Sequence, residues 1–245
     1  MIQIKNAAEL AKMRRACEIS AAALKAGGAA IEPGISTAEI DKIIYDFIVR
    51  HGARPNFLHL YGFPATACIS VNDTVIHGIP TRDQKIRPGD IVSIDTGCKI
   101  DGFNGDNACT FGCGKLDMEA QRLLDVTRES LHLGIQAAQA GARIGDIGHA
   151  VQSYVEENGF SVVRAFVGHG VGKELHEDPE VPNYGRPAMA RGLCRVCASR
   201  LNRWSTSTST MSRPWATDGR SKPVTAAWLL TLSIPSPSPR TAPKC

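Results

Sequence analysis

The chain has 245 residues, of which 43% are apolar and 21% are charged, as in an ordinary globular protein. This length suits one large domain or two small ones and can bury a substantial core. The polar N-terminus lacks the apolar stretch of a signal peptide, and no later segment resembles a membrane span. We therefore expect a cytoplasmic protein without membrane attachment, whose eight scattered cysteines are reduced thiols.

The net charge of +4 hides an uneven distribution of charged residues. Residues 189–245 contain nine Lys or Arg and one acidic residue, Asp218, so that residues 1–188 carry a net charge of −4. This mildly acidic front part does not offer the basic face that nucleic acids require. We therefore expect no specific nucleic-acid partner.

The first part of the chain predicts two helices. The segment Asn6-Ala-Ala-Glu9 has the spacing of a capping box, and apolar residues at helical spacing predict a helix over residues 7–26. A second capping box, Ser36-Thr-Ala-Glu39, begins another amphipathic helix, which Gly52 ends.

The middle of the chain has the pattern of strands. Ala67–Val71 and Ile91–Thr96 are short, β-branched runs bounded by turn residues. Asp101-Gly102 is a strong hairpin signal, and Phe103–Phe111 is the expected return strand.

Two further helices, about Asp117–Ala140 and Ile144–Asn158, precede an expected strand over Ser161–Val167. A helix pair thus occurs twice beside strands, which indicates two related halves. Hairpin-linked strands with grouped helices favour an α+β fold over a doubly wound parallel sheet.

Two aspartates of this hairpin are candidates for a metal site. If the turn is centred on Asp101-Gly102, residue 97 lies opposite Asp106, and Asp95 is the diagonal neighbour of Asp106 on the same face. Two carboxylates placed in this way repel each other unless a cation lies between them. The alternative is a pair of solvated surface aspartates, but Asp95 follows a strongly apolar run.

Histidines are weaker signals when each is taken alone. His169 lies in the glycine-rich segment Gly168–Gly172, where a histidine bonded to the backbone is an equally good interpretation. His77 by itself favours a structural role. Cys194-Arg-Val-Cys197 is half of a zinc motif without a second half, and it predicts no zinc site.

Several segments in this order carry a family resemblance. They are Val75-Ile-His-Gly-Ile-Pro80, Arg87-Pro-Gly-Asp-Ile-Val-Ser-Ile-Asp95, Asp101-Gly-Phe-Asn-Gly-Asp106 and Val167-Gly-His-Gly-Val-Gly-Lys-Glu-Leu-His176. Together they resemble bacterial-type methionine aminopeptidases of peptidase family M24, over roughly residues 1–186. The resemblance implies the pita-bread fold, in which two pseudo-symmetric halves surround a curved antiparallel sheet, here with an incomplete C-terminal lobe.

By the same resemblance, Asp95, Asp106 and His169 are ligands of two divalent metal ions, and Asp106 bridges them. Oxygen ligands with one imidazole suit Mn²⁺, Fe²⁺, Co²⁺ or Zn²⁺. His77 and His176 match the catalytic histidines that contact substrate.

Three further residues, Phe63, Cys68 and Leu175, match positions that line the methionine pocket. Leu175 stands where the resemblance leads us to expect an aromatic residue, so the resemblance does not define the shape of that pocket.

The implied activity is removal of the initiator methionine from nascent proteins by a monomeric enzyme, with association to the ribosome as a further expectation. One alternative is a non-catalytic binding module of the same fold. Another is a prolidase-type hydrolase, although only about 75 residues precede His77 and leave no room for the extra N-terminal domain of that group.

The family site also requires two glutamates near the C-terminus, and neither is found here. Residues 1–187 therefore correspond to an incomplete catalytic domain. Residues 188–245 form an aberrant basic tail, rich in Ser, Thr and Pro, which we expect to be disordered. Since two of five metal ligands are missing, we expect impaired activity.

The genetic code suggests how the tail arose. In the frame that joins the last base of each codon to the first two of the next, Ala198–Thr206 permits Phe-Ala-Ile-Glu-Pro-Met-Val-Asn. The same frame permits Gly-Asp-Gly-Trp-Thr-Val-Lys across Trp215–Lys222 and Ala-His-Phe-Glu-His-Thr-Ile across Leu229–Ser236. These are the expected family segments in the expected order. We infer a frameshift near Arg186–Arg191, either a true mutation or a sequencing error.

Overall fold

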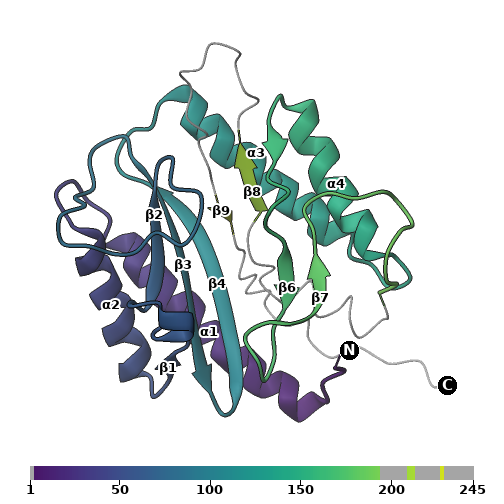
Figure 1. Cartoon of the computed structure of the whole chain (residues 1–245), viewed down its shortest axis with the longest axis horizontal. Coiled ribbons are helices and arrows are strands. Elements are labelled where there is room, and N and C mark those ends of the chain that lie inside the picture. The colour runs from purple at the N-terminus through teal and green to yellow at the C-terminus, as the bar shows by residue number, and fades with distance from the viewer. Residues whose placement is uncertain (1–2, 194–208, 213–226, 229–245) are drawn as a thin grey trace, which may run out of the picture.

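The computed structural model describes residues 3–193, 209–212 and 227–228. Two helix pairs lie on the outside of antiparallel strands, one pair on each side of the molecule (Figure 1). In chain order the elements are α1 (Ala7–Ala29), α2 (Thr37–Arg50), β1 (Arg54–Pro55), η1 (Leu60–Gly62), β2 (Ala67–Val71), β3 (Ile91–Ile100), β4 (Phe103–Gly112), α3 (Met118–Ala137), α4 (Ile144–Glu157), β5 (Ser161–Val162), β6 (Gly168–Gly170), β7 (Glu177–Val181), β8 (Ser209–Ser212) and β9 (Ala227–Trp228).

Both predicted capping boxes begin helices. The Asn6 side chain accepts a hydrogen bond from the backbone N–H of Glu9, and Ser36 caps α2 in the same way. Helix α1 continues beyond the predicted residue 26, because Gly27 and Gly28 pack against other elements. A Cβ at Gly28 would overlap the ring of Phe111 on β4. The absence of side chains here lets α1 approach the sheet closely.

The predicted hairpin is confirmed. Strand β3 pairs with β4 from Ile91 to Ile100, and Gly97 lies opposite Asp106, as the sequence predicts. Both turn residues, Asp101 and Gly102, have positive φ angles of 52° and 81°, as a type I′ turn requires. Strand β3 is longer than the predicted run to Thr96, because pairing with β4 continues to the turn.

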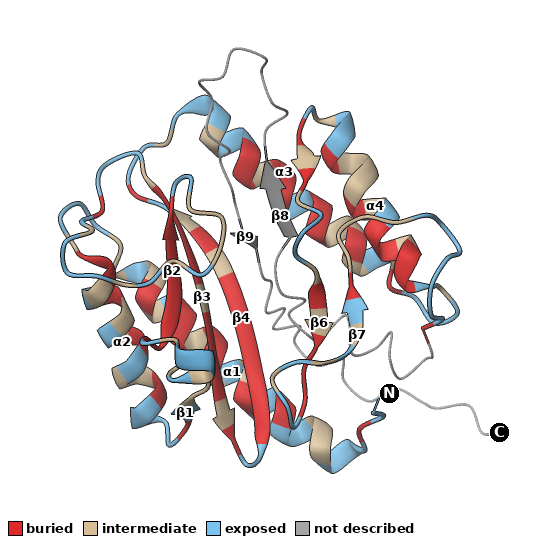
Figure 2. Cartoon of the chain, viewed as in Figure 1, coloured by how far each residue is buried: buried red, intermediate tan, exposed pale blue. Residues whose placement is uncertain are grey.

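The first half of the molecule is a sheet covered by one helix pair. Strand β3 pairs antiparallel with β1, β2 and β4, and α1 packs on β3 and β4. Figure 2 shows buried residues along these strands and on the inward faces of the helices. The core includes the fully buried side chains Ile40, Ile44, Ile48, Ile69, Val92 and Ile94.

The second half contains α3 and α4, which pack on each other and on a separate core around Leu123, Val155 and Phe160. The prediction of one strand over Ser161–Val167 is wrong. β5 ends at Val162 and β6 begins at Gly168, because residues 165–167 turn toward a cavity instead of continuing the ladder. The antiparallel ladders and grouped helices agree with the predicted α+β class.

Most of the predicted tail, including Cys194–Cys197, lies outside the described residues. Within it, the backbone of β8 pairs with β5 and that of β9 pairs with β8. The domain division at residue 187 therefore stays a prediction. Within residues 3–193, Cys17, Cys68, Cys98, Cys109 and Cys113 are free thiols. None of the described helices combines the length and apolarity needed to cross a membrane.

Candidate active site

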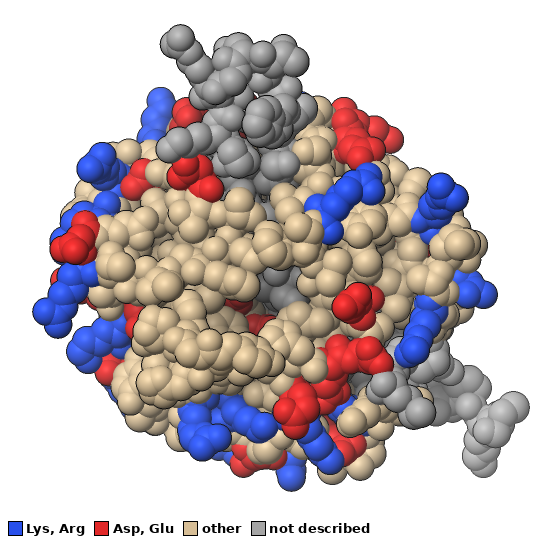
Figure 3. All heavy atoms as spheres, in the orientation of Figure 1, with Lys and Arg blue, Asp and Glu red and all other residues tan. Residues whose placement is uncertain are grey.

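A cavity of about 920 Å³ lies between the two halves, and both contribute residues to its wall. In Figure 3 the surface is hollowed near the centre, acidic atoms lie in its depth, and mostly uncharged residues surround it. Every site residue predicted from the sequence lines this cavity: Phe63, Cys68, His77, Asp95, Asp106, His169, Leu175 and His176. Residues far apart in the chain are thus brought to one place.

The two aspartates come from neighbouring strands, Asp95 on β3 and Asp106 on β4. Asp106 is only 4% exposed, which rules out a pair of solvated surface aspartates. Burial raises the pKa of Asp106 to about 7. Burial also raises the pKa of Asp95 well above its usual value, and repulsion from Asp106 adds to this effect. Among the described residues, the buried Oδ1 of Asp95 has no hydrogen-bond partner.

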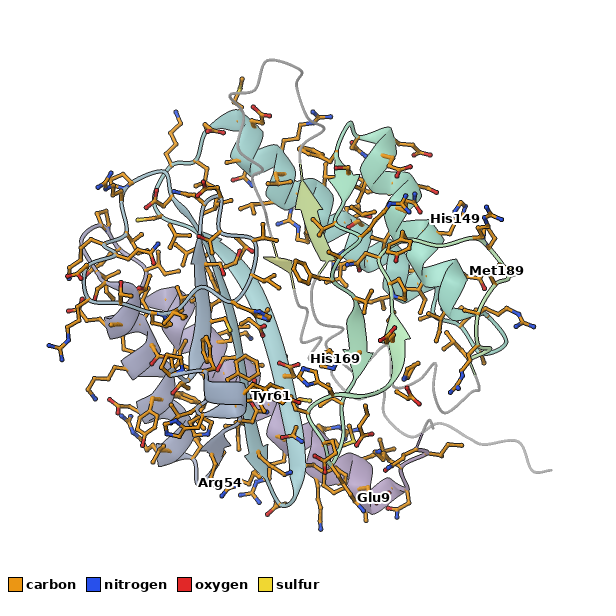
Figure 4. All side chains as sticks on the ribbon, viewed as in Figure 1. Glu9, Arg54, Tyr61, His149, His169 and Met189 are labelled. Atoms are coloured by element: carbon orange, nitrogen blue, oxygen red, sulfur yellow. The ribbon has the colours of Figure 1, made fainter. Side chains whose placement is uncertain are left out.

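His169 projects from β6 toward β4, between the two halves (Figure 4). Its Nε2 lies 3.7 Å from Oδ2 of Asp106. Its Nδ1 lies 3.0 Å from the carbonyl oxygen of Gly170, so Nδ1–H donates to that oxygen and Nε2 carries the free lone pair. Burial lowers the pKa of His169, which favours the neutral ring. A neutral imidazole whose Nε2 faces a carboxylate could bind a metal ion.

Two more histidines share the cavity. The ring of His176 meets that of His169 edge to face, with centroids 4.4 Å apart and planes at 70°. Burial lowers the pKa of His176, and the neighbouring His169 and His77 lower it further. His77 is exposed and has a φ of 56°, in the left-handed region. Its exposure shows that His77 is not a core residue.

The cavity has apolar parts that sequence reasoning missed. Phe57, Ile76, Ile79 and Phe166 join Phe63, Cys68 and Leu175 in its wall. Tyr61, also in the wall, is 92% exposed and has a φ of 49°. The Gly-Phe-Pro sequence after Tyr61 could have indicated an irregular loop, but not that it borders the cavity.

Three acidic residues in the wall were also missed: Glu177, Asp178 and Glu180. They lie on β7, and Glu180 is the ladder partner of His169. Their position on this strand depends on the β6–β7 pairing, which no local pattern predicted.

The donors Asp95, Asp106 and His169 fit a hard divalent cation in their chemistry, and the partnerless buried oxygen of Asp95 supports such an ion. The described residues nevertheless contain no group of three or more His, Cys, Asp or Glu side chains close enough to hold a metal. These three donors therefore line one cavity without forming a complete metal site among the described residues.

Comparison with known proteins agrees with this geometry. Residues 11–196 match the model of metallopeptidase family M24. The chain is 46% identical, over 219 residues and 88% of each chain, to the methionine aminopeptidase of Clostridium perfringens.

Solved structures of methionine aminopeptidases are also similar to this chain. The methionine aminopeptidase of Thermotoga maritima has a TM-score of 0.85 at 33% identity and covers 94% of each chain. That of Rickettsia prowazekii has a TM-score of 0.84 at 32% identity and covers 93% of each chain. The fold is therefore the pita-bread fold expected from the motifs.

Proposed function

The chain belongs to metallopeptidase family M24 and to the methionine aminopeptidases within it, and on this basis we propose that its cavity removes N-terminal methionine in a metal-dependent hydrolysis. The observation that carries the proposal is the convergence of eight predicted site residues on one cavity. The substrates are nascent proteins, so the cytoplasm is the proposed location and the ribosome a proposed partner.

Asp95, Asp106 and His169 would hold the metal, as a pair of Mn²⁺, Fe²⁺, Co²⁺ or Zn²⁺ ions. Such ions would supply a nucleophilic water of lowered pKa and would polarise the scissile carbonyl. The buried carboxylates suit this role, since a cation offsets the repulsion between them. The Nδ1–H bond to Gly170 keeps His169 in the tautomer that can bind.

His77 and His176 act on the substrate. From its place beside His169, His176 can donate a hydrogen bond to the oxyanion that develops at the scissile carbonyl. His77 contacts the substrate from the opposite half of the molecule. Phe63, Cys68 and Leu175 receive the methionine side chain in an apolar pocket.

The test is release of methionine from a Met-Gly peptide by the purified full-length chain, with and without Mn²⁺ or Co²⁺. Slow release that the metal accelerates and a chelator abolishes is expected. The same peptide with an acetylated N-terminus should be inert, because the site acts on a free amine.

Other outcomes would favour the alternatives. Cleavage of Xaa-Pro peptides, with no action on Met-Gly, would point to a prolidase. Metal and peptide binding without any cleavage at stoichiometric enzyme would point to a binding module of this fold.

A further inference from the structure

His176 has no rigid support of its own. It lies at the end of the connection between β6 and β7, and it is exposed. Within the described part of the chain its ring makes no hydrogen bond and only an edge contact with His169. Its position must therefore be set by the backbone on either side.

On the N-terminal side, Asn104 holds this connection. Asn104 is on β4 and is 2% exposed. Its backbone N–H donates to the carbonyl oxygen of Gly172 at 2.8 Å. Its side-chain Nδ2 donates to the carbonyl oxygens of Gly172 and Lys173, at 3.0 and 2.9 Å. One buried residue thus fixes two consecutive peptide groups of the other half.

Asn104 is itself held by a residue that follows β1 in the same half of the molecule. Asn56, next to the cavity residue Phe57, donates from Nδ2 to the Oδ1 of Asn104 at 3.3 Å. This bond fixes the orientation of the Asn104 amide, so that its Nδ2 faces the carbonyls of the connection.

On the C-terminal side, Lys5 holds the next residue. Its Nζ lies 2.6 Å from Oε2 of Glu177, and the side chains are only 2% and 9% exposed. The other carboxylate oxygen of Glu177 accepts a hydrogen bond from the backbone N–H of Glu174 at 3.2 Å. This bond links the β6–β7 connection to the first residue of β7. Removing one partner of so buried a pair leaves an uncompensated charge.

A second contact lies nearby. Lys173 forms an exposed ion pair with Glu9 in the first turn of α1, at 3.4 Å. Figure 1 shows this end of α1 beside the β6–β7 connection. The N-terminal segment therefore reaches across to the opposite half at the point where His176 is presented.

We propose that Lys5 and Asn104 are positioning residues that together clamp the β6–β7 connection and so present His176 to the substrate. The proposal rests on the proposed function only for the role of His176. The clamp itself is a property of the metal-free chain and can be tested without any activity.

The test compares the full-length chain with Lys5→Met, Asn104→Ala, Lys5→Arg and Lys42→Met by hydrogen exchange. Lys42→Met is the matched control, since it removes a lysine from an exposed ion pair with Asp46 on α2. In Lys5→Met and Asn104→Ala, amides of residues 172–177 should exchange at least ~10-fold faster, with β2 and β3 unchanged. Lys5→Arg, which keeps the charge, and Lys42→Met should behave as the unaltered chain.

The ring of His176 is followed in the same proteins by NMR of labelled histidine, with the signal assigned by its loss in His176→Gln. One sharp signal should become broad or split in Lys5→Met and Asn104→Ala, while that of His51, at the C-terminal end of α2, stays constant. An unchanged His176 signal in both variants would overturn the proposal. So would faster exchange spread evenly over the chain, because that is general destabilisation. Neither result bears on whether the chain cleaves Met-Gly peptides.

Discussion

The Nε2 atom of His169 on β6 lies 3.7 Å from the Oδ2 atom of Asp106 on β4, across the boundary between the two halves. No ladder joins these two strands in the described part of the chain. The contact is therefore set by how the halves pack. It brings an imidazole to a buried carboxylate whose pKa is raised to about 7, the kind of environment in which a divalent cation is stabilised.

Asp106→Asn should weaken Mn²⁺ binding. The substitution keeps the shape of the side chain but removes the negative charge that faces Asp95 and His169. Outer-shell changes already cost 10–100-fold in metal affinity, so loss of a ligand should cost at least ~100-fold. Isothermal titration calorimetry measures this directly. The matched control is Asp101→Asn, at the exposed turn of the same hairpin. If the two variants bound Mn²⁺ with equal affinity, Asp106 would not be a metal ligand.

Gly78→Ala should destabilise the chain and disturb the loop that carries His77. A Cβ at Gly78 would overlap the backbone carbonyl of Ile69 on β2, and the Gly78 N–H donates to Ser70 at 3.1 Å. The backbone of Ile69 cannot move away from the added Cβ without displacing β2. We therefore expect the free energy of unfolding to fall by about 1–3 kcal/mol. Urea denaturation measures it.

The control for this substitution is Gly192→Ala, where an added Cβ meets no atom within 4 Å. That variant should stay within ~0.5 kcal/mol of the unaltered chain. If both alanines had the same effect, close packing at Gly78 would not be the cause.

Replacing the tail should restore activity. In a chimera, residues from 188 onward give way to the corresponding part of the Clostridium perfringens methionine aminopeptidase, which is 46% identical over the matched region. If the two missing glutamates limit metal binding, the chimera should release methionine at least ~100-fold faster than the unaltered chain. Equal rates would show that the chain is not impaired. Sequencing the gene across the codons of residues 186–191 tests the frameshift itself.

Glu39→Gln should change how stability depends on pH. Hydrogen bonds from Ser36, with Lys85 adding to them, lower the pKa of Glu39 from 4.5 to about 2. A lowered pKa means that the folded state favours the ionised form. The resulting stability is complete above pH 4.5 and is lost as the pH falls toward 2.

Urea denaturation at pH 7 and at pH 2 tests this. The unaltered chain should be more stable than Glu39→Gln at pH 7, and the two should converge at pH 2. Glu18→Gln on α1 is the control. If the unaltered chain and Glu39→Gln differed in stability at pH 2 by as much as at pH 7, the charge of Glu39 would not be the cause.

Local patterns were sufficient for much of this protein. Both capping boxes, the Asp101-Gly102 turn and the pairing of Gly97 with Asp106 follow from interactions between residues close in sequence. The α+β class followed from hairpin-linked strands with grouped helices, a pattern of periodicity and spacing that a chain carries before it folds. Asp95, Asp106 and His169 were proposed as metal ligands from the family resemblance of the segments that contain them.

Tertiary structure decided the rest. Only packing shows that His169 faces Asp106, that Glu180 pairs with His169, and that Tyr61 borders the cavity. Only packing joins Lys5 to Glu177 and Asn104 to the connection that bears His176. These contacts bridge segments far apart in the chain, and their energies come from burial and removal of water. No local pattern encodes them, because each exists only once the two halves have met.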